Sequence, residues 1–429
     1  MSNKDLLNNK HFYFHSLELE GINCFKDRQT LDLSDANGNY SPWSIILGDN
    51  GTGKTTLLRV LDRMQLEIYY LNQNSDESKD KYAPLILSNK FFKSLDFRIE
   101  LKIKNHEQSI DVNTIVSDVY REFTNFSEKL FFLLSYGATR RMSDKDISTS
   151  KDDINSKKTS LFDQNTELIN AEYWYLQKFT AYSAADNGIK IRLKEQLDLV
   201  TKILIDFLPD VLDLRIKEIK TLNEKASLEV KINQKEWINL RDLSFGYQTL
   251  TALIVDIASK MMEQYPESEN PLTEPVIVLI DEIDLHLHPK WQRTVIDKLS
   301  QNFPKAQFIA TSHSPLIVQA AQDKGANIVV CRKEGEKVII DNNPDEVNGW
   351  RIDQILISDL FDTGSSRSFE TENYIKEKNN ILSQRDLLES DKKRLKVLNA
   401  KIKSIPFSMD KEGINAEEII KKAAELLNK

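Results

Sequence analysis

A glycine-rich stretch near residue 50 has the spacing of a loop that binds phosphate. Gly48, Gly53, Lys54 and Thr55 match the pattern G-x-x-x-x-G-K-[ST], and Gly51 adds a further glycine. Glycine reaches backbone angles that other residues avoid, so that successive N–H groups can turn toward one anion. In such a loop Lys54 reaches the β- and γ-phosphates, and the Thr55 hydroxyl binds Mg²⁺.

The residues around this loop predict a strand before it and a helix after it. Residues 43–47 have the apolar character of a buried strand, and a helix is expected over residues 55–69. The phosphates then lie at a helix N-terminus, where free amides and the helix dipole favour an anion. A glycine turn without function is the alternative, but it leaves this context unexplained. The residues expected to bind nucleotide here are Asn50, Gly51, Thr52, Gly53, Lys54, Thr55 and Thr56.

Two acidic residues follow the most apolar run of the chain. Residues 276–280, VIVLI, are typical of a central parallel strand, and Asp281 and Glu282 then stand at the sheet edge where ligands bind. We expect Asp281 to hold Mg²⁺ through water and Glu282 to act as general base toward the attacking water. Surface charge at a strand end is the alternative. The phosphate loop elsewhere in the chain favours the catalytic interpretation.

Two further segments can complete a nucleotide site. The hexapeptide LSFGYQ, residues 243–248, precedes a helix predicted over 249–262, so that Ser244 can offer a hydroxyl and nearby free amides to a phosphate. An ordinary serine N-cap has the same local sequence. Residues 308–314 form another short apolar strand that ends at His313, which can contact a γ-phosphate. A lone histidine after a strand is more often structural, but the neighbouring motifs favour the phosphate contact.

The composition is that of a soluble globular protein with room for two or three domain-sized units, since 40% of the 429 residues are hydrophobic and 29% are charged. The net charge of −8 argues against a protein that coats DNA evenly, but it leaves a local basic groove possible. The two cysteines are too few for a disulfide framework. No secretory signal is apparent, and no apolar run reaches the roughly 20 residues of a membrane span. The sequence therefore predicts a cytoplasmic protein.

Four motifs, GDNGTGKT, LSFGYQ, VIVLIDE and TSH, resemble in order and spacing those of ABC-class ATPases. More narrowly they resemble the branch with the SMC, RecF and overcoming-lysogenization (OLD) proteins, whose opening hairpin is similar to residues 17–33. The resemblance implies an α/β fold, an ABC-type P-loop NTPase head with a mixed sheet flanked by helices, and ATP and Mg²⁺ as cofactors. It also implies a homodimer or higher oligomer in which two heads sandwich two ATPs. Ser244 and Gly246 of one subunit then close on the γ-phosphate held by the other, with Gln248 among the nucleotide contacts.

Two features depart from that family pattern. His288 stands six positions after Glu282, where many ABC heads have an aspartate. A metal site at His286 and His288 is an alternative, but their i, i+2 spacing lacks the i, i+4 pairing of helical zinc ligands. The usual glutamine loop has no evident counterpart. Its place can be taken by residues 131–141, where Arg140 or Arg141 either faces phosphate or lies on the surface.

The rest of the chain suggests a divided head with two additions. The head is predicted to comprise residues 1–140 and 240–362, interrupted by a mainly helical insertion over 141–239, and followed by a helical partner-docking region over 363–429. Apolar residues every seven positions suggest that this last region begins with a helical hairpin, broken near 387–391, and packing on the chain's own head is the alternative to docking. The finer expectations are paired strands at 97–103 and 109–115, a polar loop at 143–159, helices over 161–207 with Trp174, Tyr175 and Phe179 buried, a strand at 228–232 and a last helix at 416–427.

Residues 349–368 resemble the end of PtuA-type ATPases from Septu and retron-associated anti-phage systems. That resemblance implies a separate HNH-type nuclease, PtuB-like, as partner, since no nuclease constellation is apparent in this chain. We therefore predict an ATPase that forms ATP-sandwich dimers and regulates or positions a partner nuclease, with nucleic acid bound through the complex. Two alternatives stay open: a RecF- or SMC-like repair ATPase that binds DNA directly, and a nucleotide-gated scaffold with little turnover.

Overall fold

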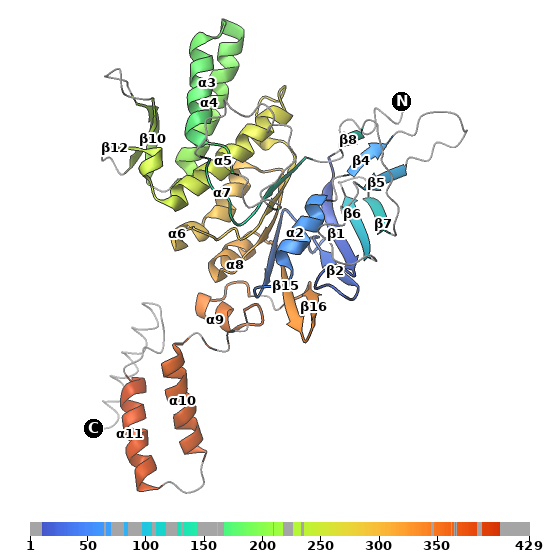
Figure 1. Cartoon of the computed structure of the whole chain (residues 1–429). Coiled ribbons are helices and arrows are strands. Elements are labelled where there is room, and N and C mark those ends of the chain that lie inside the picture. Colours follow the sequence, from blue (N-terminus) through green and yellow to red (C-terminus); the bar gives the residue numbers. More distant parts are fainter. Residues whose placement is uncertain are drawn as a thin grey trace. The chain divides into compact units, whose positions relative to one another are not determined.

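The protein folds into two compact units, which Figure 1 shows on one ribbon. The first contains Met1–Ile355 and Asp359–Phe361, and the second contains Leu356–Ser358 and Asp362–Lys429. The structure is a computed structural model, and it describes residues 11–63, 66–69, 81–84, 97–104, 109–116, 127–129, 132–143, 161, 167–208, 210–217, 226–232, 236–344, 347–361, 363, 365, 367–383 and 388–403.

A central sheet organises the first unit. Across the described residues its strands lie in the order β16-β15-β3-β14-β13-β9. All neighbours pair in parallel except β16, which runs antiparallel to β15. The strands are β3 (Trp43–Gly48), β9 (Leu133–Tyr136), β13 (Val276–Ile280), β14 (Ala306–Thr311), β15 (Asn327–Glu334) and β16 (Lys337–Asp341). The predicted α/β class with a mixed sheet is confirmed, and the ends of β3, β13 and β14 that precede the predicted site residues share one sheet edge.

Both faces of the central sheet are buried, which explains why its strands read as continuous apolar runs. In β13, Val276, Val278 and Ile280 belong to one hydrophobic core, whereas Ile277 and Leu279 belong to another. Successive side chains of a strand point to opposite faces, so the two cores lie on the two sides of the sheet.

One face is covered by α2 (Lys54–Arg63) and by an antiparallel sheet, visible on the side of β1 and β2 in Figure 1. In that sheet β2 (Gln29–Asp32), β1 (Tyr13–Glu20), β6 (Phe97–Lys104) and β7 (Ser109–Val116) are neighbours in this order. The antiparallel pairing of β6 with β7 confirms the predicted strand pair.

The helix expected over residues 55–69 is confirmed as far as Arg63 and is wrong over residues 66–69. It ends at Arg63, and β4 (Leu66–Tyr69) follows, paired with β5 (Lys81–Pro84) and β8 (Ser127–Lys129). The sequence of β4, LEIY, contains a β-branched and an aromatic residue, which favour a strand where a partner is available.

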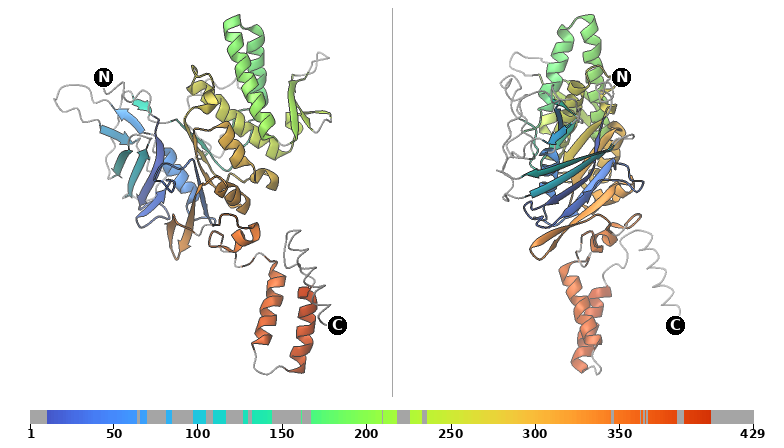
Figure 2. Two further views of the ribbon diagram at one scale, coloured as in Figure 1. Left: turned by 180° about the vertical axis from the view of Figure 1, so that it is seen from behind. Right: turned by 90° about the vertical axis from the view of Figure 1, so that its right-hand side faces the viewer.

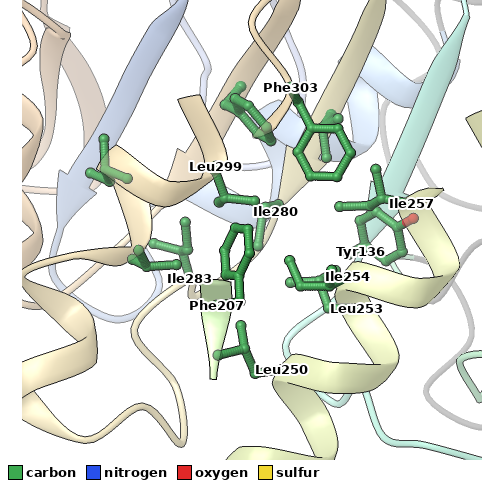
Figure 3. Close-up of a cluster of buried hydrophobic side chains, with 14 of the residues drawn as sticks. Tyr136, Phe207, Leu250, Leu253, Ile254, Ile257, Ile280, Ile283, Leu299 and Phe303 are labelled. Carbon is green, nitrogen blue, oxygen red and sulfur yellow. The ribbon is translucent and has the colours of Figure 1, made fainter. Parts of the chain in front are cut away.

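The opposite face is covered by helices. These are α5 (Phe245–Gln264), α6 (Pro289–Gln292), α7 (Val295–Asn302) and α8 (Pro315–Gln322), with a short 3₁₀ helix, η3 (Pro271–Thr273), after α5. Figure 3 shows Leu250, Ile254 and Ile257 of α5 against Ile280 of β13 and Phe303. The predicted helix over 249–262 is confirmed, and it begins four residues earlier, at Phe245.

The insertion holds two helices and a small sheet. The helices α3 (Ala171–Ala184) and α4 (Asn187–Phe207) lie side by side in both views of Figure 2. They are followed by an antiparallel sheet of β10 (Val211–Ile216), β11 (Leu228–Ile232) and β12 (Trp237–Asn239), then by η2 (Leu240–Asp242). The predicted strand at 228–232 is confirmed. Trp174 is buried as expected, but Phe179 is 42% exposed, because five residues along a helix amount to a rotation of about 140° from Trp174.

The second unit contains an antiparallel helix pair. α10 (Phe369–Leu382) and α11 (Glu389–Lys403) are joined by an ion pair between Arg394 and Glu377 (2.6 Å) and by a hydrogen bond from Lys401 to Tyr374 (2.7 Å). The predicted hairpin is confirmed. A short helix, α9 (Ile352–Ile357), lies where the chain passes between the units. The polar loop expected at 143–159, apart from Ser143, and the helix expected at 416–427 lie outside the described residues. None of the described helices is long and apolar enough to cross a membrane.

Candidate nucleotide site

The loop between β3 and α2 depends on glycines at two crowded positions. Gly48 has φ +138°, and a side chain there would come within 2.3 Å of the Cys331 carbonyl oxygen. Gly53 has φ +84°, and its side chain would meet Cys24 Sγ at 2.5 Å. Both positions therefore exclude larger residues by space as well as by backbone angle. Gly51, at φ +81°, has open space around it and needs glycine for conformation alone.

Lys54 is the first residue of α2 and is buried within the loop. Its Nζ donates to the carbonyl oxygens of Gly48 (2.7 Å) and Asp49 (2.8 Å). Burial lowers the pKa of Lys54, and the nearby acidic groups, Asp281 and Glu282 among them, oppose this shift. The ammonium thus stands at the helix N-terminus, where an anion is favoured.

Asp281 and Thr55 bring a carboxylate and a hydroxyl oxygen close together. Thr55 Oγ1 donates to Asp281 Oδ2 at 2.9 Å, and Thr311 Oγ1 donates to Asp281 Oδ1 at 2.6 Å. Asp281 is buried at the end of β13, so the two hydroxyls satisfy its carboxylate. A hydroxyl and a carboxylate suit Mg²⁺, which keeps phosphate oxygens and waters as its remaining ligands.

Glu282 sits in a turn with a left-handed backbone, φ +49°. Its N–H donates to Thr311 Oγ1 at 2.7 Å, which ties the end of β13 to β14. Glu282 is partly exposed, whereas Asp281 is buried, and Glu282 lines the cavity described below. A carboxylate in this position can accept a proton from a water beside a bound phosphate.

His313 follows β14 and is exposed at the same sheet edge. Its N–H donates to Asp284 Oδ1 at 3.3 Å, and Ser312 Oγ donates to the same oxygen at 2.7 Å. Asp284 thereby fastens the segment after β14 to the segment after β13. This arrangement keeps His313 beside Glu282 at the mouth of the site.

These residues line one cavity of about 820 Å³, within the usual range for a small-molecule site. Of the predicted site residues, the structure brings together Asn50, Gly51, Gly53, Lys54, Thr55, Thr56, Asp281, Glu282 and His313 around it. Thr52 is not among the lining residues, because its side chain turns into the loop and donates to the Asp49 carbonyl at 2.8 Å.

Sequence reasoning missed the outer wall of this cavity. Gly21, Asn23, Cys24 and Lys26 from the connection of β1 to β2 line it, as does Glu336 from the turn between β15 and β16. Lys26 and Glu336 form an ion pair of 3.2 Å across these two turns. The glycine and asparagine of the first turn are a local turn signal, but nothing in the sequence relates residue 26 to residue 336.

The motif LSFGYQ stands apart from this cavity in the same chain. Of the described residues that line the cavity, none belongs to it. Ser244 is exposed as N-cap of α5, and Gly246 packs so closely on the loop after β13 that a Cβ would lie 2.5 Å from the His286 carbonyl oxygen. The Gln248 side chain donates to the carbonyls of Arg241 (2.8 Å) and Leu243 (2.9 Å), so its amide nitrogen serves the preceding turn.

The two histidines and two arginines left open by the sequence have distinct places. His286 stacks edge-on against Phe245, and His288 caps α6 by accepting from the Lys290 N–H at 3.2 Å. Arg141 is exposed and pairs with Glu167 at 3.0 Å. Arg140, in contrast, is buried and is not one of the described residues that line the cavity.

The sequence family can be assigned once this geometry is known. The profile of a family described as "AAA domain, putative AbiEii toxin, Type IV TA system" matches residues 44–319, which run from β3 to α8. The chain belongs to this AAA family. Its AAA domain therefore contains the phosphate loop, LSFGYQ, both acidic residues and His313.

Several known proteins are similar to this AAA protein. The Septu protein PtuA of Bacillus mycoides is 25% identical over 82% of this chain and 45% of its own length. A retron Vc95 probable ATPase of Vibrio cholerae is 39% identical over 32% of the chain and 26% of its own length. The chain thus spans less than half of these two relatives. The Septu protein PtuA of Bacillus thuringiensis is 24% identical over 76% of the chain and 80% of its own length. Among solved structures, the SMC head domain from Thermotoga maritima aligns over 77% of this chain and 99% of that one, with 12% identity and a TM-score of 0.41.

Proposed function

We propose that this protein binds and hydrolyses ATP with Mg²⁺. The observation that carries the proposal is the meeting of Lys54, Thr55, Asp281 and Glu282 at the N-terminus of α2. The amides of the loop and Lys54 bind the β- and γ-phosphates. Thr55 and Asp281 hold Mg²⁺, which neutralises developing charge on the phosphates when bound. Glu282 then takes the proton of the attacking water, and His313 contacts the γ-phosphate.

The test separates binding from hydrolysis. Glu282→Gln keeps the shape of the side chain but removes the base, so we expect ATP affinity within about threefold of wild type and turnover reduced by about 10²–10⁴-fold. Lys54→Met should abolish ATP binding. Glu267→Gln, a change at a highly exposed glutamate, is the matched control and should leave both quantities unchanged. Normal hydrolysis by Glu282→Gln would show that Glu282 is not the base.

We further propose that a second copy of the chain completes the site. Ser244 is exposed at the N-terminus of α5, its side chain makes no capping hydrogen bond, and beside it Phe245 is 50% exposed. The N-terminus of α5 is therefore exposed, and the cavity of the same chain makes no use of it. In an ATP-sandwich dimer, Ser244 and Gly246 of one copy close on the γ-phosphate held by the other.

The role that we propose is in anti-phage defence, where this ATPase regulates or positions a separate HNH-type, PtuB-like nuclease. The similarity of the chain to proteins named Septu protein PtuA and retron probable ATPase supports this proposal. The helix pair α10–α11 is the part proposed to dock that partner. Co-expression with a PtuB-like HNH nuclease should give co-purification and protect cells in a phage plating assay, and Glu282→Gln should abolish the protection. Salt-sensitive DNA binding by the protein alone, without protection, would instead favour a repair ATPase.

A further inference from the structure

A buried arginine lies directly beneath the two acidic residues of the site. Arg140 is 3% exposed, and its guanidinium donates to the carbonyl oxygens of Gly137 (3.1 Å), Asp281 (2.6 Å) and Glu282 (2.8 Å). The last two bonds come from different nitrogens of the same side chain, Nη1 and Nη2. A planar fork of donors matches two successive carbonyls, as a lysine ammonium cannot.

The turn that Arg140 contacts has an unfavourable backbone angle at Glu282. Glu282 has φ +49°, a region that residues other than glycine avoid and that the surrounding structure must enforce. Thr311 Oγ1 of β14 accepts the Glu282 N–H, and Arg140, after β9, binds the Glu282 carbonyl. The peptide groups of Glu282 are thus fixed from both neighbouring strands of the sheet.

Acidic groups lie near the Arg140 guanidinium, but the hydrogen bonds of the guanidinium are made to carbonyl oxygens. Burial lowers the pKa of Arg140 to about 10, while the nearby charges of Asp281, Asp284 and Glu282 oppose the shift, so the guanidinium stays protonated at neutral pH. The hydrogen bonds recorded for it go to carbonyl oxygens. None of these bonds from Arg140 therefore uses a carboxylate oxygen of Asp281 or Glu282.

The residues that follow Arg140 are hydrogen-bonded to the segment before α3. The Leu168 N–H donates to the Arg141 carbonyl (2.8 Å), and the Ser143 N–H donates to the Leu168 carbonyl (3.0 Å). Asn170, which caps α3 through the Tyr173 N–H, also donates to the Ser143 carbonyl at 2.9 Å. The segment after Arg140 is thereby fixed to the start of α3.

We propose that Arg140 is a positioning residue for hydrolysis. It holds the backbone of the Asp281–Glu282 turn so that the Glu282 carboxylate meets the attacking water. The inference rests on the proposed ATPase function, and it adds a residue that touches neither nucleotide nor metal. It also gives Arg140, which lies in the segment 131–141 expected to replace the glutamine loop, a role other than contact with phosphate.

The first test compares neighbouring arginines. Arg140→Lys keeps the charge but loses the fork, so kcat should fall at least tenfold while the Kd for ATP stays within threefold and thermal unfolding confirms a folded protein. Arg141→Lys, on the surface, should leave kcat unchanged. If Arg140→Lys does not fold, Arg140→Gln, whose amide can still donate to one carbonyl, is measured in the same way. A kcat within twofold of wild type would overturn the proposal.

The second test asks whether Arg140 acts through Glu282. In a Glu282→Gln background, Arg140→Lys should lower the residual kcat no further, since residues that act as one unit are not additive. A full tenfold loss in that background would contradict the assignment.

Hydrogen exchange distinguishes this inference from the ATPase proposal. Arg140→Lys should speed amide exchange of Glu282 and Ile283 at least tenfold without nucleotide, and Arg141→Lys should not. Absence of ATP turnover in the wild-type protein would defeat the proposed function alone. Unchanged exchange at the turn would defeat the role of Arg140.

Discussion

At the scale of single residues, the phosphate loop shows two separate demands on glycine. Gly48 needs both a positive φ and empty space, because the Cys331 carbonyl oxygen lies where a Cβ would be. Gly38, in the turn before β3, also has a positive φ, +72°, but a Cβ added there would meet nothing within 4 Å. A comparison of Gly48 with Gly38 therefore distinguishes the cost of the backbone angle from the cost of the steric clash.

We therefore predict different losses of stability for the same substitution. Gly38→Ala should lower the free energy of unfolding by about 1 kcal/mol, the strain of a left-handed alanine. Gly48→Ala should lower it by at least about 2–3 kcal/mol, since the backbone must also move. Urea unfolding measures both. Equal losses would mean that the loop yields freely around residue 48.

A second residue-scale prediction concerns Asp62 of α2. It is buried and accepts a hydrogen bond from Ser135 Oγ, and burial raises its pKa above the ordinary value of 3.8. A carboxyl with a raised pKa contributes its full stability below the unfolded pKa and loses it as the pH rises through the folded pKa. The charged form of Asp62 thus lowers the free energy of unfolding at neutral pH.

Asp62→Asn should remove this dependence while keeping an oxygen for Ser135. The free energy of unfolding of the variant, relative to wild type, should be highest near pH 7 and fall as the pH approaches 4. Urea titrations at several pH values give the difference. A relative stability that rises toward acid would show that Asp62 is favoured in its charged form.

At the scale of elements, α5 is buried in the core along most of its length, and its N-terminus, with Ser244 as N-cap, is exposed. Most of the helix is buried between the central sheet and α4, as the residues of Figure 3 show, so its N-terminus is held in a fixed place. Gly246, in its first turn, lets the loop after β13 approach to contact. The position of Ser244, which we propose to contact phosphate, therefore depends on this packing.

Two helical glycines should respond to alanine with opposite signs. Gly188, in the first turn of α4, has open space, so Gly188→Ala should raise the free energy of unfolding by about 0.5–1 kcal/mol. Gly246→Ala would place a Cβ 2.5 Å from the His286 carbonyl oxygen, so it should lower stability by about 1–3 kcal/mol. Thermal and urea unfolding measure both. A stabilised Gly246→Ala variant would remove the packing role of this glycine.

At the scale of the whole molecule, the two halves of the proposed site are separate in one chain. We predict that Glu282→Gln doubles in mass in light scattering when ATP and Mg²⁺ are added, because unhydrolysed ATP keeps the sandwich closed. Ser244→Arg in the same background should prevent the doubling while leaving ATP binding intact. Ser183→Arg, at an exposed serine of α3, is the control. A dimer that persists with Ser244→Arg would contradict the sandwich.

Local patterns were enough for the central strands and the phosphate loop. The apolar runs ending at Asp281 and near His313 predicted β13 and β14, since strands buried on both faces are mostly apolar. The end of α2 was mistaken because a short helix and a short strand share similar side chains, and pairing with β5 and β8 decided between them. The exposure of Phe179 was mispredicted because Trp174 and Phe179 lie about 140° apart around α3, so both cannot lie on one buried face.

The sequence by itself determined the chemistry that we propose for this protein: the phosphate loop, the acid proposed to bind magnesium and the proposed general base are each recognised by residue type and short-range spacing. Tertiary structure alone decided which distant groups support them. It placed Arg140 under the Glu282 turn, brought Lys26 to Glu336 at the rim, and left Ser244 outside its own cavity. Such contacts join residues far apart in the chain, and they exist because the sheet order brings strand ends together, a property of the folded core.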